Sequence, residues 1–123
     1  MAEARRLAAE KRGRRSETLA ALLLRLKGYR ILGRRVRTHA GEIDLIARAP
    51  TGLVCFIEVK ARTDAALASD ALGPRQQARI ARAAQLFLAG RPELAAKGAR
   101  FDVVTVSPGT FPRHIRDAWR PGD

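Results

Sequence analysis

The sequence has few of the residues that stabilise small proteins through covalent or aromatic contacts. It holds one cysteine, one tryptophan and one tyrosine in 123 residues, and aromatic residues make up 5% of the chain. A single cysteine excludes an internal disulfide and is typical of a reducing compartment. The core must therefore be aliphatic, in a chain long enough for one domain and too short for two.

Long apolar runs are also missing. No stretch approaches the 18 consecutive apolar residues of a membrane-spanning helix, and the arginine-rich start lacks the apolar run of a secretory signal. We therefore expect a cytoplasmic protein that does not enter a membrane. Cys55 stands between two apolar residues, so we expect a buried and inert thiol.

Acidic residues are outnumbered two to one, which gives a formal net charge of +12. The excess is front-loaded, because residues 1–37 hold twelve Lys and Arg against three acids. Such a patch attracts polyanions, of which nucleic acid is the commonest, with an anionic membrane surface and ribosomal RNA as rivals. A merely solvated, arginine-rich surface stays open as the plainer interpretation.

The periodicity of the apolar residues indicates one domain over residues 16–120, preceded by a basic arm or helix extension over residues 1–15. Leucines recur at helical spacing from Leu19 to Leu26, and Gly28 supplies a stop. The opposite side of this helix is apolar as well, through Ala20, Ala21 and Leu24. We therefore expect the helix to be covered on more than one face.

Alternating patterns then predict strands over 29–38, with a bulge at Gly33, and over 41–48 and 53–62, which a Pro-Gly turn joins into an antiparallel hairpin. A loop over 63–73 leads to a helix that opens at Pro74. Two further strands are expected, in "RFDVVTVSPG" and "HIRDAW". The order of helix, three strands, helix and one or two strands predicts an α/β or α+β layer sandwich. The buried face of the second helix is expected to comprise Ile80, Ala83, Ala84 and Phe87.

Four charged residues interrupt the apolar hairpin. Residues two apart on a strand share a face, so Glu42, Asp44 and Ile46 are expected on one side and Gly41, Ile43 and Leu45 on the other. On the partner strand, Glu58 and Lys60 are expected to share a face with Phe56. Each strand thus changes from apolar to charged along one face, which predicts a polar cleft.

A divalent cation explains why two acids would be kept there. Two carboxylates about 4 Å apart repel by roughly 4 kcal/mol at an effective dielectric of 20, so something positive must offset them. Mg²⁺ or Mn²⁺ fits, with Asp44 and Glu58 as ligands and the backbone carbonyl of Val59 as a candidate third. Lys60 is then placed to orient the attacking water and to offset charge in phosphodiester hydrolysis. The plainer alternative is a solvated face with weak cross-strand ion pairs.

The segments "GEIDLIA" and "FIEVKAR" resemble the signature of the restriction-endonuclease-like PD-(D/E)xK nuclease superfamily. Over residues 12–119 the chain resembles, more closely, the YraN-type family of bacterial proteins, which is akin in fold to archaeal Holliday junction resolvases. The resemblance implies a three-layer sandwich with a mixed central sheet. It also implies Asp44 and Glu58 as metal ligands and Lys60 as the catalytic lysine.

The same resemblance adds residues around the centre. It implies Glu17 as a further acidic member, although a first-turn glutamate equally complements a helix dipole. It implies Glu42 as an outer acid or the partner of an arginine in the cleft. It also implies Gln77 as a residue facing the cleft, where the plainer interpretation is a polar first-turn residue. Related sequences tend to have a lysine where this chain has Gln76 and an aromatic residue where it has Val36, which puts substrate contacts in doubt more than chemistry.

The leading hypothesis is a metal-dependent endonuclease acting on DNA, with branched DNA as a candidate substrate. The alternatives are a catalytically silent module that binds nucleic acid or a protein partner, and a metal-independent RNA-associated protein. A junction-resolving nuclease would need two sites and hence a homodimer, for which no interface pattern is seen. The expected phosphate contacts are the arginines Arg12, Arg14, Arg15, Arg34, Arg35 and Arg37, and a helical stripe of Arg75, Arg79 and Arg82.

Overall fold

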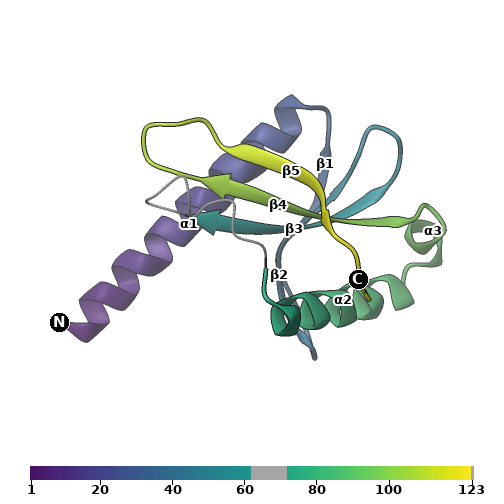
Figure 1. The fold of residues 1–123 in the computed structure, drawn as a ribbon, viewed down its shortest axis with the longest axis horizontal. Coiled ribbons are helices and arrows are strands. Elements are labelled where there is room, and N and C mark those ends of the chain that lie inside the picture. The colour runs from purple at the N-terminus through teal and green to yellow at the C-terminus, as the bar shows by residue number, and fades with distance from the viewer. Residues whose placement is uncertain (62–71, 123) are drawn as a thin grey trace.

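The chain forms three layers, with helices on both sides of one mixed sheet (Figure 1). The computed structural model describes residues 1–61 and 72–122, so most of the loop expected over 63–73 lies outside the described residues. The expected α+β order is confirmed, with one short additional helix. None of the helices described combines the length and apolarity that crossing a bilayer requires. The elements are α1 (Ala2–Leu26), β1 (Arg30–Thr38), β2 (Gly41–Arg48), β3 (Val54–Ala61), α2 (Pro74–Ala89), α3 (Pro92–Ala95), β4 (Ala99–Val106) and β5 (Arg113–Trp119).

The strands lie in the order in which they occur in the chain, β1-β2-β3-β4-β5. Neighbours are antiparallel except β3 and β4, which are parallel because the chain crosses over through α2 between them. The predicted hairpin of β2 and β3 is confirmed. A register shift between Ile31 and Gly33 confirms the bulge expected in β1.

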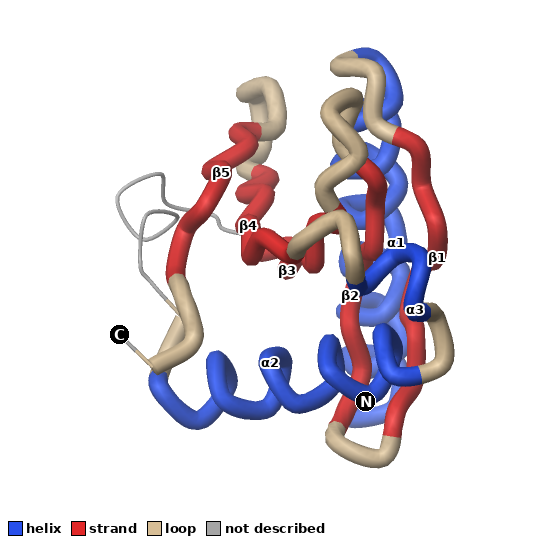
Figure 2. Tube along the Cα trace, turned by 90° about the vertical axis from the view of Figure 1, so that its right-hand side faces the viewer, coloured by secondary structure: helices blue, strands red, loops and turns tan. Residues whose placement is uncertain are grey.

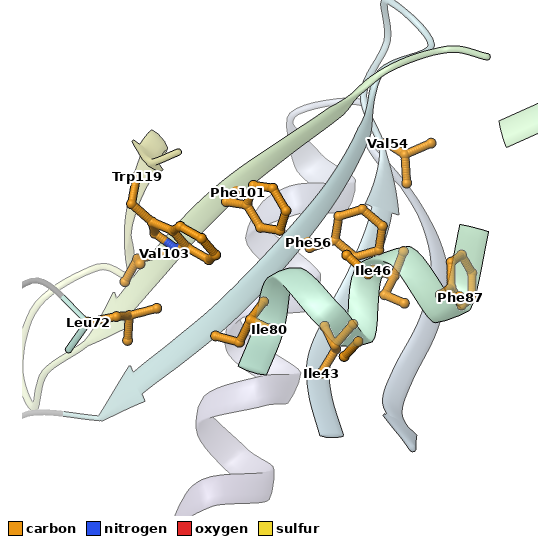
Figure 3. Close-up of a cluster of buried hydrophobic side chains, with 12 residues drawn as sticks. Ile43, Ile46, Val54, Phe56, Leu72, Ile80, Phe87, Phe101, Val103 and Trp119 are labelled. Atoms are coloured by element: carbon orange, nitrogen blue, oxygen red, sulfur yellow. The ribbon is translucent and has the colours of Figure 1, made fainter. Parts of the chain in front are cut away.

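One core lies between the sheet and α2, which runs along the concave side of the curved sheet (Figure 2). The predicted buried face of α2 is confirmed in full, from Ile80 to Phe87. These side chains pack on Phe56 and Phe101 of β3 and β4, and Trp119 closes the end of the cluster (Figure 3). The ring centroids of Phe101 and Trp119 are 4.3 Å apart. The aromatic contacts fix α2 against the strands that carry the acids.

The second core lies between the sheet and α1, and here one of the two faces that were expected to be covered is buried and the other is exposed. The buried face of α1 comprises the small residues Ala20 and Ala21 with Leu24, whereas Leu22 and Leu26 are 50% and 78% exposed. The helix is therefore covered on one face only, because alanines allow the closest approach to the sheet. Cys55 is fully buried in this core, and burial raises the pKa of its thiol to about 11, as expected of an inert cysteine.

The basic segment before residue 16 continues α1 as helix, so of the two alternatives the extension is the one observed. Alternation along β2 also departs from prediction. Ile43 packs in the α2-side core and Leu45 in the α1-side core, although residues two apart should share a face. The pleat is interrupted at Asp44, opposite which Arg35 of β1 has a left-handed φ of 51°.

A buried ionic cluster joins β4 to β5 on the α1 side. Asp102 is fully buried and accepts two hydrogen bonds of 2.8 Å from the guanidinium of Arg100. His114 bonds to the same carboxylate at 2.8 Å, as befits a core histidine, and the backbone N–H of Asp117 donates at 3.0 Å. Burial alone would raise the pKa of Asp102, but these hydrogen bonds hold it at about 2.

We expect Asp102→Asn to lower the free energy of unfolding by about 3 kcal/mol, because it removes a fully buried charge and leaves the partly buried Arg100 without its counter-charge. Urea unfolding at pH 7 measures this. Asp117→Asn is the matched control: Asp117 is exposed with a φ of 53°, which asparagine tolerates, and it should cost under about 1 kcal/mol. Equal losses in the two variants would contradict a structural role for the buried charge.

Candidate metal and nucleic-acid site

The site forms where β3 continues beyond the end of its pairing with β2. The ladder between these strands ends at the pair Leu45–Ile57, while β3 stays paired with β4 as far as Ala61. The last residues of β3, after Ile57, are therefore not paired with β2. Asp44 comes from β2, and Glu58 and Lys60 come from the free end of β3.

Direct contacts link these residues into a chain. The backbone N–H of Val59 donates to Oδ2 of Asp44 at 2.8 Å, and the charge of Asp44 acts on the neighbouring carboxyl group of Glu58. Gln76, in the first turn of α2, donates a long 3.5 Å hydrogen bond to Oε2 of Glu58. Its carbonyl oxygen accepts from Nζ of Lys60 at 3.3 Å. The structure thus brings together the predicted acid, acid and lysine.

The environment disfavours two negative charges on this pair. Burial raises the pKa of Asp44, and the nearby carboxylates of Glu17 and Glu42 add to the rise, while the hydrogen bonds from Val59 and with Glu58 oppose it. Burial and then the charge of Asp44 raise the pKa of Glu58 to about 8, against the opposing charge of Lys60. The pair therefore shares a proton at neutral pH.

Two observations fit a divalent cation at this pair. Oε1 of Glu58 is buried and has no hydrogen-bond partner, so one carboxylate oxygen is unsatisfied. A shared proton marks excess negative potential that a cation would neutralise instead. Mg²⁺ commonly takes one or two carboxylates and completes its shell with water and substrate phosphate. Within residues 1–61 and 72–122 no cluster of three or more His, Cys, Asp or Glu is arranged to hold a metal ion, so the pair would act alone.

The other predicted acids lie beside the pair and bind arginines. Glu17 is buried on α1, and its Oε1 accepts a 2.6 Å hydrogen bond from Nε of Arg35. This contact raises the pKa of the Arg35 guanidinium. Glu42 is exposed and pairs with Arg37 at 3.4 Å. Roles of Glu17 and Glu42 in metal binding, and of the Val59 carbonyl as a ligand, stay predictions.

Gln77 turns away from the carboxylates and donates from Nε2 to the carbonyl of Leu72 at 2.8 Å. The residue that contacts Glu58 and Lys60 is Gln76, to which the sequence analysis gave no role. Helical spacing carried the signal, because Gln76 precedes Ile80 by four residues and therefore extends the buried face of α2 toward the sheet.

The predicted phosphate-binding arginines lie on two surfaces. Arg75, Arg79 and Arg82 are exposed on α2 and are called the α2 stripe below; the stripe brackets Gln76, and the stem of Arg79 lies close over Gly41. The second surface is on α1 and β1: Arg14 and Arg15 are exposed, Arg34 donates to Thr18, and Arg35 and Arg37 bind acids as described. The Arg12 side chain lies outside what the structure describes.

Comparisons with known proteins agree on one family. The model of "Uncharacterised protein family UPF0102" matches residues 16–106. A UPF0102 protein of Parvibaculum lavamentivorans is 54% identical over 115 residues, which cover 94% of this chain and 86% of that protein. One from Maricaulis maris is 54% identical over 123 residues, with 100% and 95% coverage, and one from Paramagnetospirillum magneticum is 54% identical over 117 residues, with 92% and 90% coverage.

The raised pKa of Glu58 predicts that stability falls with rising pH. The folded protein keeps a proton that the unfolded chain releases near pH 4.5, so stability is lost between about pH 5 and pH 8, by up to about 1.4 kcal/mol per pH unit. Glu58→Gln should flatten this slope, whereas exposed Glu93→Gln should not. Urea unfolding from pH 5 to pH 8 measures both slopes, and an unchanged slope in Glu58→Gln would contradict the shared proton.

Proposed function

Given that the chain belongs to the uncharacterised protein family UPF0102, we propose from its site that it is a divalent-metal-dependent endonuclease that hydrolyses DNA phosphodiesters. The observation that carries the proposal is the buried Asp44–Glu58 pair, which shares a proton and leaves Oε1 of Glu58 without a hydrogen-bond partner. Gln76 links this pair to Lys60 by hydrogen bonds to both Glu58 and Lys60. A solvated face of weak ion pairs would show none of these features. The likeness to the PD-(D/E)xK signature supports the same conclusion.

Asp44 and Glu58 are the residues that would hold Mg²⁺ or Mn²⁺. Bound there, the ion supplies Lewis-acid polarisation of a phosphoryl oxygen and lowers the pKa of its water. Because the pair keeps a proton in its absence, binding is coupled to proton release and strengthens as the pH rises. Oδ2 of Asp44 is already fixed by the Val59 N–H, which orients this carboxylate before any ligand arrives.

Lys60 contributes positive charge beside the carboxylates. Its ammonium offsets the negative charge that grows on the phosphoryl oxygens during hydrolysis, and it orients the attacking water. Gln76 holds this side chain through its carbonyl oxygen while its amide donates to Glu58, so one residue positions both groups. Gln76 is therefore a positioning residue, placed by the α2 core.

The cations around the site suit a phosphate backbone. The α2 stripe flanks Gln76, which contacts Glu58 and Lys60, and the net charge of +12 supports binding of a polyanion. Backbone contacts carry no sequence information, so selectivity must come from the shape of the DNA. This supports a structure-selective enzyme with branched DNA as its candidate substrate.

A catalytically silent DNA-binding module is the second candidate. The observation in its favour is that no third acid of the described residues joins the pair in a metal-binding cluster. Against it stands the buried, unsatisfied Glu58, since a module without chemistry gains nothing from this unfavourable group. Cleavage assays separate the two candidates.

We expect the parent chain to cut DNA with Mg²⁺ or Mn²⁺, and Glu58→Gln and Lys60→Met to lose at least ~100-fold in rate, because each removes a charge from the reacting centre. Linear, flapped, single-stranded and four-way-junction DNA should each be tested by gel assay. Glu93→Gln, which removes an exposed acid on α3, is the matched control and should cut like the parent.

Calorimetric titration with Mn²⁺ supplies a readout without turnover. The parent should bind more tightly at pH 8 than at pH 6, and Glu58→Gln should bind weakly at both. Equal cutting by Glu58→Gln and the parent would show a contaminating nuclease. A parent that binds DNA but cuts no substrate would favour the silent module.

The α2 stripe should set the salt dependence of DNA binding. Replacing its three arginines by alanine should reduce the slope of log affinity against log salt by about 2 to 3, since each lost phosphate contact contributes about 0.9. A triple alanine variant of exposed cations elsewhere, Arg25, Arg30 and Lys97, is the control and should change the slope little. Fluorescence anisotropy between 50 and ~200 mM salt gives the slopes. Equal effects of the two triples would exclude the stripe as the interface.

A further inference from the structure

One aromatic side chain is exposed, whereas the other aromatic side chains are buried. Phe111 is 95% exposed, while each of the five other aromatic residues is at most 8% exposed. Exposing a phenylalanine forgoes the free energy that burial of its ring would contribute. The ring of Phe111 is therefore accessible for a contact with something outside the chain.

The segment that carries Phe111 is an ordered turn. It spans residues 107–112 at the apex of the β4–β5 hairpin, where Thr110 donates from its backbone N–H and its hydroxyl to the carbonyl of Ser107, at 3.3 and 3.2 Å. Gly109 adopts a φ of 76°, which the turn requires, and Pro108 and Pro112 restrict the backbone on either side. The phenyl ring thus projects from a hydrogen-bonded turn, and little backbone conformational entropy is lost when the ring binds a partner.

The strand register places this apex beside the proposed catalytic residues. Thr105 of β4 pairs with Lys60 of β3 on one side and with Arg113 of β5 on the other. Residues in register share a face, so Lys60, Thr105 and Arg113 form a row across the sheet, with the Cα atoms of Lys60 and Arg113 about 10 Å apart, or two strand spacings. Figure 1 shows the β4–β5 turn and the end of β3 at the same end of the sheet.

Two cations on the strands that flank β4, with an exposed ring beyond them, match the chemistry of a nucleic-acid strand. The cations suit successive phosphates, and an aromatic face suits a base, because every base presents a π-face. Continuous duplex hides those faces within its stack. A branch point, a flap or a strand end exposes one.

We propose that Phe111 stacks on an unstacked DNA base at a branch point or strand end while Lys60 and Arg113 contact the adjoining phosphates. The hairpin apex then acts as the element that distinguishes branched from continuous DNA. The inference rests on the proposed nuclease function and names its substrate class. Phe111 is a specificity-determining residue, and the chemistry stays with the carboxylates and Lys60.

Binding is measured by anisotropy in Ca²⁺, which we use as a non-reactive cation, on a four-way junction, a flap and a linear duplex of equal length. We expect Phe111→Ala to lose ~10-fold in affinity for junction and flap and to keep its affinity for the linear duplex, since stacking on an aromatic ring contributes about 1–3 kcal/mol per base. Phe111→Trp should retain the preference. Leu26→Ala, which removes another exposed apolar side chain at the far end of α1, is the matched control.

A 2-aminopurine placed at the branch point gives a direct readout, because its fluorescence changes when its stacking partner changes. The parent and Phe111→Trp should change this signal and Phe111→Ala should not. If Phe111→Ala binds and cuts every substrate as the parent does, this inference is overturned and the proposed nuclease function stands. If the parent binds no DNA at all, both are overturned.

Discussion

The hydrogen bond from the backbone N–H of Val59 to Oδ2 of Asp44 forms where the backbone ladder between β2 and β3 ends. A side chain of β2 takes the place of its backbone as the partner of β3, so the two strands separate without leaving this N–H unsatisfied. The separation frees the end of β3 and brings the carboxyl group of Asp44 against that of Glu58. The polar site and the reversal of faces between Ile43 and Leu45 both occur where this side-chain hydrogen bond replaces the backbone ladder.

The buried acids Asp102 on β4 and Glu58 on β3 differ in how fully their carboxyl groups are hydrogen-bonded. Asp102 receives donors from two side chains and one backbone N–H, and its pKa stays at about 2 despite complete burial. Glu58 receives a long hydrogen bond from Gln76, faces a second acid and has a pKa of about 8. The fold can therefore satisfy a buried carboxylate fully, and at Glu58 it does not. A charge left in that condition is a cost to stability, and such costs concentrate where a ligand supplies the missing partner.

Much of this arrangement follows from sequence patterns, and the exceptions have physical causes. The 3.6-residue period of α2 gave its buried face, and the period of two gave the hairpin and the shared face of Glu58 and Lys60. The same rule failed at Ile43 and Leu45, because it cannot anticipate that Asp44 bonds to a neighbouring strand. The leucines of α1 suggested the wrong face, since close approach to the sheet selects small residues such as Ala20 over larger ones. To predict the contacts of Gln76 with Glu58 and Lys60, both the phase of α2 and the position of β3 had to be known.

Arg35 bears on whether Glu17 acts as a ligand. Its left-handed backbone is unfavourable by roughly 1–2 kcal/mol for a residue with a side chain, and the 2.6 Å ion pair with Glu17 offsets this cost. The charges of Glu17, Glu42 and Asp44 all act on the guanidinium of Arg35, so this arginine offsets part of their negative charge from the β1 side. The proton held by Asp44 and Glu58 offsets negative charge from the β3 side. A cation at Asp44 and Glu58 displaces only the proton. Oε1 of Glu17 is already bonded to Arg35, so direct ligation by Glu17 would have to use Oε2 or break this ion pair.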